Sequence, residues 1–348
     1  MTYAALLKWA ARELDDVGIE GARREAELLL AYILGIRRED LYLMNPQTEV
    51  GANLRANAAS DAATATVTAR FQEVVARRAA REPLAYITGV KEFYGLTFAV
   101  DQRVLIPRPE TELLVELCLE HLERVEHLER LERLEHLERL ERRSGELSRE
   151  QSQPYVVADI CTGSGAVGIA VAVNRPDVSI LASDISAAAL EVAADNARRH
   201  GVSERIILAQ GDLFDPWQSS TLSPSPPSSQ SPPPNAAGRL LDRATNRTID
   251  VILCNPPYIP QDVIAALQPE IRDYEPRQAL EAGVDGLSFY RRLFSQAGAF
   301  LNQNGLLLAE IGDGQQNAVL CIAQENGWNA STVPDLAGIA RVVIAKRV

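Results

Sequence analysis

Cysteine is scarce in this sequence. The chain has 348 residues and only four cysteines, and no two of them form a Cys-x-x-Cys pair. Neither a disulfide framework nor a zinc site is therefore indicated, because both require closely patterned cysteines. We expect ordinary buried thiols and no bound metal.

A long apolar run is also missing. No stretch approaches the roughly 18 uninterrupted apolar residues that a membrane-spanning helix needs. The N-terminus mixes Lys8, Arg12 and acidic residues into a short apolar pattern, which is not typical of a signal peptide. These absences predict a cytoplasmic protein without a membrane partner.

Positive charge is in deficit, since the formal net charge is -12. A broad nucleic-acid footprint needs Lys and Arg gathered on one face. We therefore expect no direct nucleic-acid binding, and an acidic surface suits a basic protein partner better. We expect the chain to act as a monomer.

Apolar spacing divides the chain into a helical part and an α/β part. Apolar residues recur at helix spacing at first, which predicts a small helical domain over residues 1–88. Aromatic and β-branched residues around Gly95 then predict a β-hairpin linker over residues 89–112. From Tyr155 onward, short apolar runs alternate with amphipathic helices. This alternation predicts a parallel sheet with helices on both faces, within a domain of residues 113–348.

Two low-complexity insertions interrupt the α/β domain, at residues 121–153 and 219–247. The first repeats Leu-Glu-Arg or Leu-Glu-His, so that an apolar residue stands at every third position. Such positions spiral round an α-helix, which predicts a solvated helix whose removal costs little packing. The second is rich in Ser and Pro and predicts a disordered loop. Neither is expected to carry chemistry.

A glycine-rich turn follows the first strand of the α/β domain. Residues 159–168 read DICTGSGAVG and open a helix, whose N-terminal N–H groups can approach a ligand. The pattern Gly163-x-Gly165-x-x-Gly168 also fits the dinucleotide fingerprint, so a nicotinamide-dependent dehydrogenase is one rival interpretation. Asp159 favours another ligand, because a carboxylate suits the ammonium of a methionine moiety but repels a pyrophosphate.

Acidic residues also end the next two strands. Asp184 is suited to the hydroxyls of a ribose, and Asp212 to an adenine amino group beside the apolar Leu213. For each aspartate taken alone, the alternative is a helix cap or a turn former, because aspartate is common at both. Open α/β sheets bind ligands at the carboxyl edge of their strands, so these two acids and Asp159 together predict an S-adenosylmethionine site.

The tetrapeptide Asn255-Pro256-Pro257-Tyr258 comes directly after a buried strand. Its prolines restrict the backbone, so the Asn255 oxygen and nearby carbonyls should be held rigidly at the sheet edge. An NH₂ group on a planar π-system is a poor nucleophile, and donating its hydrogens to these acceptors aims its lone pair. Tyr258 should lie against the planar group. An ordinary loop is the alternative, but the position after the glycine turn predicts a methyltransferase with Asn255, Pro256 and Tyr258 as catalytic residues.

Several stretches resemble the release factor glutamine methyltransferase family, and the similarity covers nearly everything except the two insertions. The matching stretches are residues 82–89, 105–112, 159–165, 255–259, 274–287 and 310–312. The resemblance implies a seven-stranded, Rossmann-like methyltransferase sheet with a small helical N-terminal domain. It also implies S-adenosylmethionine as the cofactor and methylation of the glutamine in the Gly-Gly-Gln motif of peptide chain release factors.

Site residues follow from the motifs and from the resemblance together. The expected cofactor contacts are Asp159, Cys161, Thr162, Gly163, Ser164, Gly165, Asp184, Asp212, Leu213 and Asn255. The expected substrate contacts are Asn255, Pro256, Pro257, Tyr258, Arg108 and Glu110.

The main alternative is a nucleic-acid methyltransferase that acts on the amino group of adenine, cytosine or guanine, since the tetrapeptide serves such enzymes equally. That enzyme would need a basic groove or a base-reading domain, and the sequence indicates neither. A catalytically inactive binding module is a third interpretation, which the intact Asn255 and Tyr258 disfavour. Binding of S-adenosylmethionine rather than NAD separates the methyltransferase from the dehydrogenase.

Overall fold

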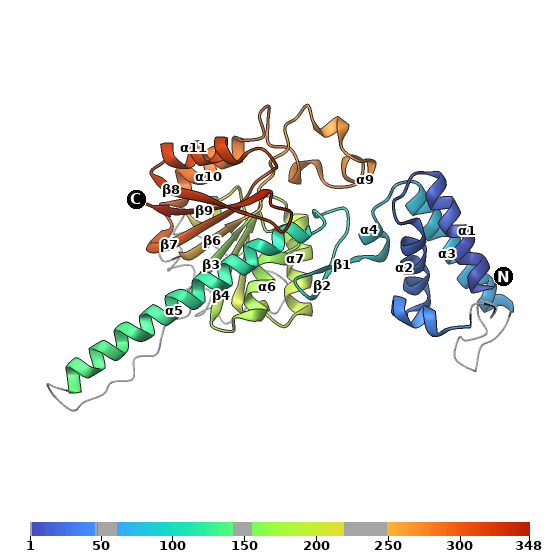
Figure 1. Cartoon of the computed structure of the whole chain (residues 1–348), viewed down its shortest axis with the longest axis horizontal. Coiled ribbons are helices and arrows are strands. Elements are labelled where there is room, and N and C mark those ends of the chain that lie inside the picture. Colours follow the sequence, from blue (N-terminus) through green and yellow to red (C-terminus); the bar gives the residue numbers. More distant parts are fainter. Residues whose placement is uncertain (1, 46, 48–60, 142–154, 219–248) are drawn as a thin grey trace. The chain divides into compact units, whose positions relative to one another are not determined.

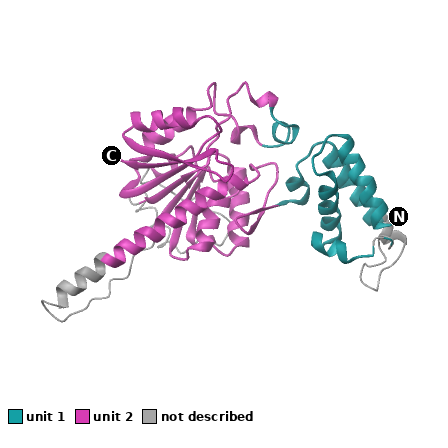
Figure 2. Cartoon of the chain, viewed as in Figure 1, with its two compact units in different colours: residues 1–90, 267–275 teal, residues 91–266, 276–348 magenta. Residues whose placement is uncertain are grey.

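The chain forms two compact units. The structure, a computed structural model, describes residues 2–45, 47, 61–141, 155–218 and 249–348. One unit comprises residues 1–90 and 267–275, and the other comprises residues 91–266 and 276–348 (Figure 2). The whole predicted loop of residues 219–247 lies outside the described residues, as does the last part of the first insertion.

The first unit is helical. Its elements are α1 (Tyr3–Asp16), α2 (Ala22–Leu34), η1 (Arg38–Leu43), α3 (Asp61–Ala79), α4 (Leu84–Thr88) and α9 (Pro269–Arg272). Thr2 caps α1, because its hydroxyl oxygen accepts a hydrogen bond from the Ala5 N–H at 3.3 Å. The fully buried side chains of this unit include Leu6, Leu14, Leu29, Leu30 and Phe71. They come from three helices, so α1, α2 and α3 share one core.

Residues 267–275 belong to the helical unit although they come late in the sequence. Glu270 on α9 accepts hydrogen bonds from Arg78 at 3.0 Å and from Arg81 at 2.9 Å. Arg78 is buried, and an unpaired buried charge is costly, so these ion pairs hold the late segment against the end of α3.

The second unit is built on a seven-stranded sheet. Its strands are β3 (Tyr155–Ile160), β4 (Val178–Asp184), β5 (Ile206–Gln210), β6 (Ile249–Cys254), β7 (Leu301–Glu310), β8 (Trp328–Pro334) and β9 (Ala340–Arg347). They lie in the order β5-β4-β3-β6-β7-β9-β8 (Figure 1). The predicted α/β fold with a seven-stranded, Rossmann-like sheet and a helical N-terminal domain is confirmed.

The sheet is mixed: the strands from which the alternation predicted a parallel sheet are parallel, and the last two strands of the chain are antiparallel. Neighbouring strands from β5 to β7 are parallel, whereas β9 is antiparallel to β7 and β8 is antiparallel to β9. A parallel connection needs a dozen or more residues. The short link between Pro334 and Ala340 can only join β8 to β9 as a hairpin.

Helices cover both faces of the sheet. One face carries α5 (Glu112–Glu141), α6 (Ala166–Asn174) and α7 (Ala187–Arg199), and the other carries α10 (Ser288–Ala297) and α11 (Gln316–Glu325) (Figure 1). Strand β6 alternates between the two cores, with Val251 and Leu253 on the α5 side and Ile252 and Cys254 on the α10 side. None of the described helices is both long enough and apolar enough to cross a membrane.

Shorter elements lie in the connections. A hairpin of β1 (Val90–Phe93) and β2 (Leu96–Ala99) turns at Tyr94 and Gly95, both with positive φ, as tight two-residue hairpins require. The 3₁₀ turns are η2 (Pro109–Thr111), η3 (Ser203–Arg205), η4 (Asp215–Trp217), η5 (Ile264–Ala266) and η6 (Arg277–Ala279).

The first insertion continues α5, but its solvated part begins later than the sequence predicted. Leu122 is fully buried and follows Cys118 by one helical turn, in the same core. His121 is also buried, which lowers its pKa to about 4. Leu128, by contrast, is 53% exposed. The expectation that the whole repeat contributes little to packing was therefore wrong for its first two residues.

Candidate active site

A cavity of about 190 Å³ lies at the carboxyl ends of the parallel strands. Here the chain order of the strands reverses between β3 and β6, which is where open α/β sheets bind ligands. The cavity brings together seven of the residues that the sequence singled out, namely Cys161, Gly163, Asp184, Asp212, Leu213, Asn255 and Pro257. Segments far apart in the sequence thus meet in one place.

Two residues of the cavity wall have strained backbones. Cys161 has a φ of 62° and Leu213 a φ of 50°, which lie in the left-handed region that few non-glycine residues adopt. Buried Ser183 supports both, because its backbone carbonyl accepts from the Thr162 N–H at 3.0 Å and its hydroxyl donates to the Leu213 carbonyl at 2.9 Å. Backbone strain of this kind clusters at ligand sites, where the surrounding structure must hold it in place.

Asp159 lies beneath the glycine turn. Its Oδ2 accepts hydrogen bonds from the Thr162 hydroxyl at 2.6 Å and from the Gly168 N–H at 3.0 Å. A Cβ at position 168 would lie only 2.9 Å from this oxygen, so glycine is required for the close approach. Burial raises the pKa of Asp159 to about 6, and the two hydrogen bonds oppose the rise. The carboxylate shapes the turn, and its contact with a cofactor ammonium stays a prediction.

Asp184 borders the cavity at the end of β4. Its carboxylate accepts hydrogen bonds from the Gly163 N–H and the Ser186 N–H, both at 2.9 Å. Burial raises the pKa of Asp184, and these backbone donors oppose the rise. The bond to Ser186 forms a turn before α7, so the residue both lines the cavity and has the turn-forming role that was the alternative interpretation.

Asp212 forms an ion pair with Arg292 on α10. The Arg292 guanidinium also lies 5.7 Å from the ring centre of Phe289, and both side chains line the cavity. Neither residue belongs to a motif, so neither was predicted from the sequence. Phe289 and Arg292 are three residues apart, so a helix places them on one face. This spacing does not predict that the face lies beside Asp212.

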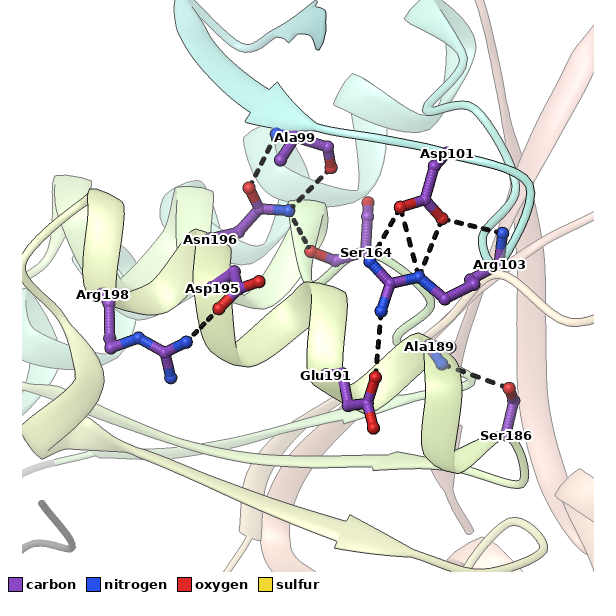
Figure 3. A network of polar contacts seen from close by, with 10 residues as sticks. All are labelled: Ala99, Asp101, Arg103, Ser164, Ser186, Ala189, Glu191, Asp195, Asn196 and Arg198. Carbon is purple, nitrogen blue, oxygen red and sulfur yellow. Dashed lines mark hydrogen bonds and ion pairs between the residues drawn. The ribbon is translucent and has the colours of Figure 1, made fainter. Parts of the chain in front are cut away.

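Arg103 is a further cavity residue that was not predicted from the sequence. Its guanidinium donates to Asp101 at 2.7 Å and to Glu191 on α7 at 2.9 Å (Figure 3). These two carboxylates fix an arginine at the cavity wall, next to the helix that follows Asp184.

The tetrapeptide is connected to two other motif stretches through side chains. The Asn255 Nδ2 donates to the Thr111 hydroxyl at 3.2 Å, and that hydroxyl donates to Glu310 Oε2 at 2.6 Å. The Tyr258 hydroxyl donates to the other Glu310 oxygen at 3.3 Å. Burial raises the pKa of Glu310 to about 7, while the bond from Thr111 and the charge of Arg341 oppose the rise.

The backbone carbonyl of Tyr258 is fixed by contacts with Gln315 and Gly286. Gln315 Nε2 donates to the Tyr258 carbonyl at 2.9 Å, and the Gly312 N–H donates to Gln315 Oε1 at 3.0 Å. A Cβ at Gly286 would lie 2.5 Å from the Tyr258 carbonyl oxygen, so only glycine fits there. The stretches 274–287 and 310–312 thus meet at the tetrapeptide.

The remaining predicted residues lie outside the cavity lining. Arg108 immediately precedes η2 and Glu110 lies within it, in the same turn as Thr111. Tyr258 bonds to Glu310 rather than lining the cavity, and Pro256 does not line it either. All the expected substrate contacts stay predictions, those of Asn255 and Pro257 included, as do all the expected cofactor contacts.

Known proteins match both units of the chain. Residues 5–89 match the PrmC N-terminal domain, and residues 146–223 match the methyltransferase small domain. The release factor glutamine methyltransferase of Geobacter sulfurreducens is 35% identical over 98% of this chain and 95% of its own length. The enzyme of the same name from Moorella thermoacetica is 35% identical over 100% of this chain and 99% of its own.

Proposed function

This chain belongs to the release factor glutamine methyltransferase family, as its motifs predicted, and from this premise we propose its substrate and methyl donor. The chain is a methyltransferase. It methylates the side-chain amide nitrogen of the glutamine in the Gly-Gly-Gln motif of peptide chain release factors, using S-adenosylmethionine. The observation that carries this proposal is the presence of Asp184 and Asn255 in the lining of one cavity.

The cavity residues fit S-adenosylmethionine by their chemistry. The Asp184 carboxylate accepts hydrogen bonds, as ribose hydroxyls require, and Asp212 can accept from an adenine amino group. Leu213 and Phe289 supply apolar walls for a planar base. When bound, this cofactor supplies an electrophilic methyl group on a sulfonium. The full set of proposed cofactor contacts is Asp159, Cys161, Thr162, Gly163, Ser164, Gly165, Asp184, Asp212, Leu213 and Asn255.

The tetrapeptide orients the glutamine amide. The Asn255 side-chain oxygen and the Pro256 carbonyl accept the two hydrogens of the NH₂ group, which directs the nitrogen lone pair toward the electrophile. Tyr258 lies against the planar amide. Pro257 keeps the backbone extended, and Arg108 and Glu110 line the substrate side of the site.

Each part of the chain takes one task in this proposal. Residues 1–88 dock the release factor, residues 89–112 form the linker, and residues 113–348 carry out methyl transfer. The net charge of -12 suits a basic protein surface as the partner. The enzyme acts as a monomer in the cytoplasm, where release factors work.

Methyl transfer from labelled S-adenosylmethionine to a purified release factor tests the proposal. We expect one methyl group per release factor, mapped by mass spectrometry to the glutamine of the Gly-Gly-Gln motif. A release factor with alanine at that glutamine is the control and should remain unlabelled. Nucleic-acid methylation is not favoured, since the relatives are named for release factors. Labelling of DNA or RNA, with none of the release factor, would overturn the proposal.

A further inference from the structure

We propose that Thr111 and Glu310 are positioning residues, which hold the Asn255 amide with its oxygen turned toward the nitrogen to be methylated. The inference deepens the proposed function and rests on it, because it concerns the acceptor that orients the glutamine. The two residues come from η2 and from the end of β7, and both are buried, with exposed fractions of 4% and 1%.

A directed chain of hydrogen bonds carries the inference. Glu310 Oε2 and Thr111 Oγ1 lie 2.6 Å apart, and the hydroxyl is the donor when Glu310 is ionised, because a carboxylate can only accept. The single hydroxyl proton of Thr111 is thereby committed to Glu310. Toward Asn255, at 3.2 Å, the Thr111 oxygen can then only accept.

This commitment fixes the orientation of the Asn255 amide. Only the nitrogen of an amide can donate, so Nδ2 must face Thr111 and Oδ1 must point the other way. The flipped amide would place two oxygens against each other at 3.2 Å with no proton between them. Among the residues that the structure describes, none donates to Asn255 Oδ1, so this oxygen is left to accept from a substrate amide.

The same chain strengthens the acceptor. Hydrogen bonds to an ionised group are stronger than neutral ones, and linked bonds polarise one another in a buried site. Nδ2 donates to Thr111, whose own proton goes to Glu310, and this donation increases the electron density on Oδ1, which is the atom that binds the substrate hydrogen. Glu310 faces Arg341 and the Tyr258 hydroxyl, which favour its charged form, and Glu110, whose charge opposes it. Tyr258 also donates to the second Glu310 oxygen, so one carboxylate supports both ends of the tetrapeptide.

A matched pair of substitutions tests the inference in the full-length enzyme. Thr111→Val removes the hydroxyl at nearly constant volume, and Thr111→Ser keeps it. We expect Thr111→Val to lower kcat by about 10- to 100-fold, with the KM for S-adenosylmethionine changed by less than about two-fold. Thr111→Ser should retain kcat to within about three-fold. Equal losses in the two variants would show that packing, not the hydroxyl, is responsible.

A double-mutant cycle separates positioning from a general structural role. If Thr111 acts only through Asn255, then Thr111→Val should lower kcat by less than about two-fold in an Asn255→Ala background. The same fold-loss in both backgrounds overturns the inference. Glu310→Gln, which can still accept from Thr111 but carries no charge, should fall between wild type and Thr111→Val.

A measurement without substrate keeps the inference testable even if release factors are not methylated. With ¹⁵N-labelled asparagine, the Asn255 side-chain amide is assigned as the NMR signal that disappears in Asn255→Ala. We expect one of its protons to be shifted downfield in wild type and in Thr111→Ser, and to move upfield in Thr111→Val. An unchanged signal in Thr111→Val contradicts the inference, whereas an inactive wild type with the expected shifts contradicts only the proposed function.

Discussion

The Asn196 side chain donates a hydrogen bond from Nδ2 to the carbonyl oxygen of Ser164 at 2.9 Å (Figure 3). The same buried amide exchanges two bonds with the backbone of Ala99, accepting at 2.7 Å and donating at 3.0 Å. One side chain of α7 therefore holds the end of β2 against the glycine turn that borders the cavity.

Replacement of Asn196 by alanine should destabilise the fold and loosen the turn. It leaves the Ala99 N–H and the Ser164 carbonyl without their partner, and we expect a loss of about 2–4 kcal/mol in the free energy of unfolding. Affinity for S-adenosylmethionine should fall as well. The neighbouring Asp195→Ala is the control, since Asp195 is exposed and, among the described residues, pairs only with exposed Arg198. Urea denaturation of both variants measures the difference, and equal midpoints would refute the role given to Asn196.

Substitution of Asp184 by alanine should act mainly on cofactor affinity. A carboxylate that binds the ribose stabilises the ground state and the transition state about equally, so its loss raises Kd more than it lowers kcat. We expect Kd for S-adenosylmethionine to rise by about 10- to 100-fold, with kcat at saturating cofactor reduced by less than about three-fold. Asp177→Ala, an exposed acid before β4, should leave both values unchanged. Isothermal titration showing unchanged affinity for Asp184→Ala would remove the residue from the cofactor site.

The cavity residues that could be predicted lie next to strand ends. The glycine turn and the tetrapeptide each follow a buried strand directly, so their backbones reach the carboxyl edge as soon as the strands are placed. Arg103, Phe289 and Arg292 could not be predicted, because they enter the cavity from a linker and from one face of α10. Only the tertiary packing of these segments decides which side chains meet there.

The side of the sheet on which Asp159 lies could have been predicted from the sequence. Side chains alternate along a strand, so Asp159 shares the face of Val157, which packs in the α6 core. This alternation places the carboxylate under the first turn of α6, where it meets the Gly168 N–H. The network of Thr111, Asn255 and Glu310, in contrast, joins three distant stretches, and no local pattern predicts it.

The burial of Glu310 should appear in the pH dependence of stability. Its pKa is about 7 in the folded protein against an ordinary value of 4.5, so the folded state holds an extra proton between these values. The free energy of unfolding therefore falls as pH rises through this window and levels off above it. Glu310→Gln has no proton to lose, so its stability relative to wild type should rise by roughly 2 kcal/mol from pH 5 to pH 8.

Urea denaturation of the two proteins across this pH range measures the difference. Asp159, whose pKa is about 6, contributes equally to both proteins and cancels from it. A difference in stability that does not change with pH would show that Glu310 titrates at its ordinary value.

The boundary of the repeat on α5 can be tested with one substitution made at two positions. Leu122 is fully buried against the sheet core, whereas Leu128 is 53% exposed in the next repeats of the same helix. A Leu→Ala change has nearly the same small effect on helix propensity at both positions, so burial accounts for the difference. Leu122→Ala should lower the free energy of unfolding by about 2–4 kcal/mol, because it removes buried methyl groups and leaves a cavity. Leu128→Ala should change it by less than about 0.5 kcal/mol. Equal and small changes in thermal or urea midpoints would mean that the solvated helix begins at residue 121, as the spacing of its apolar residues alone predicts.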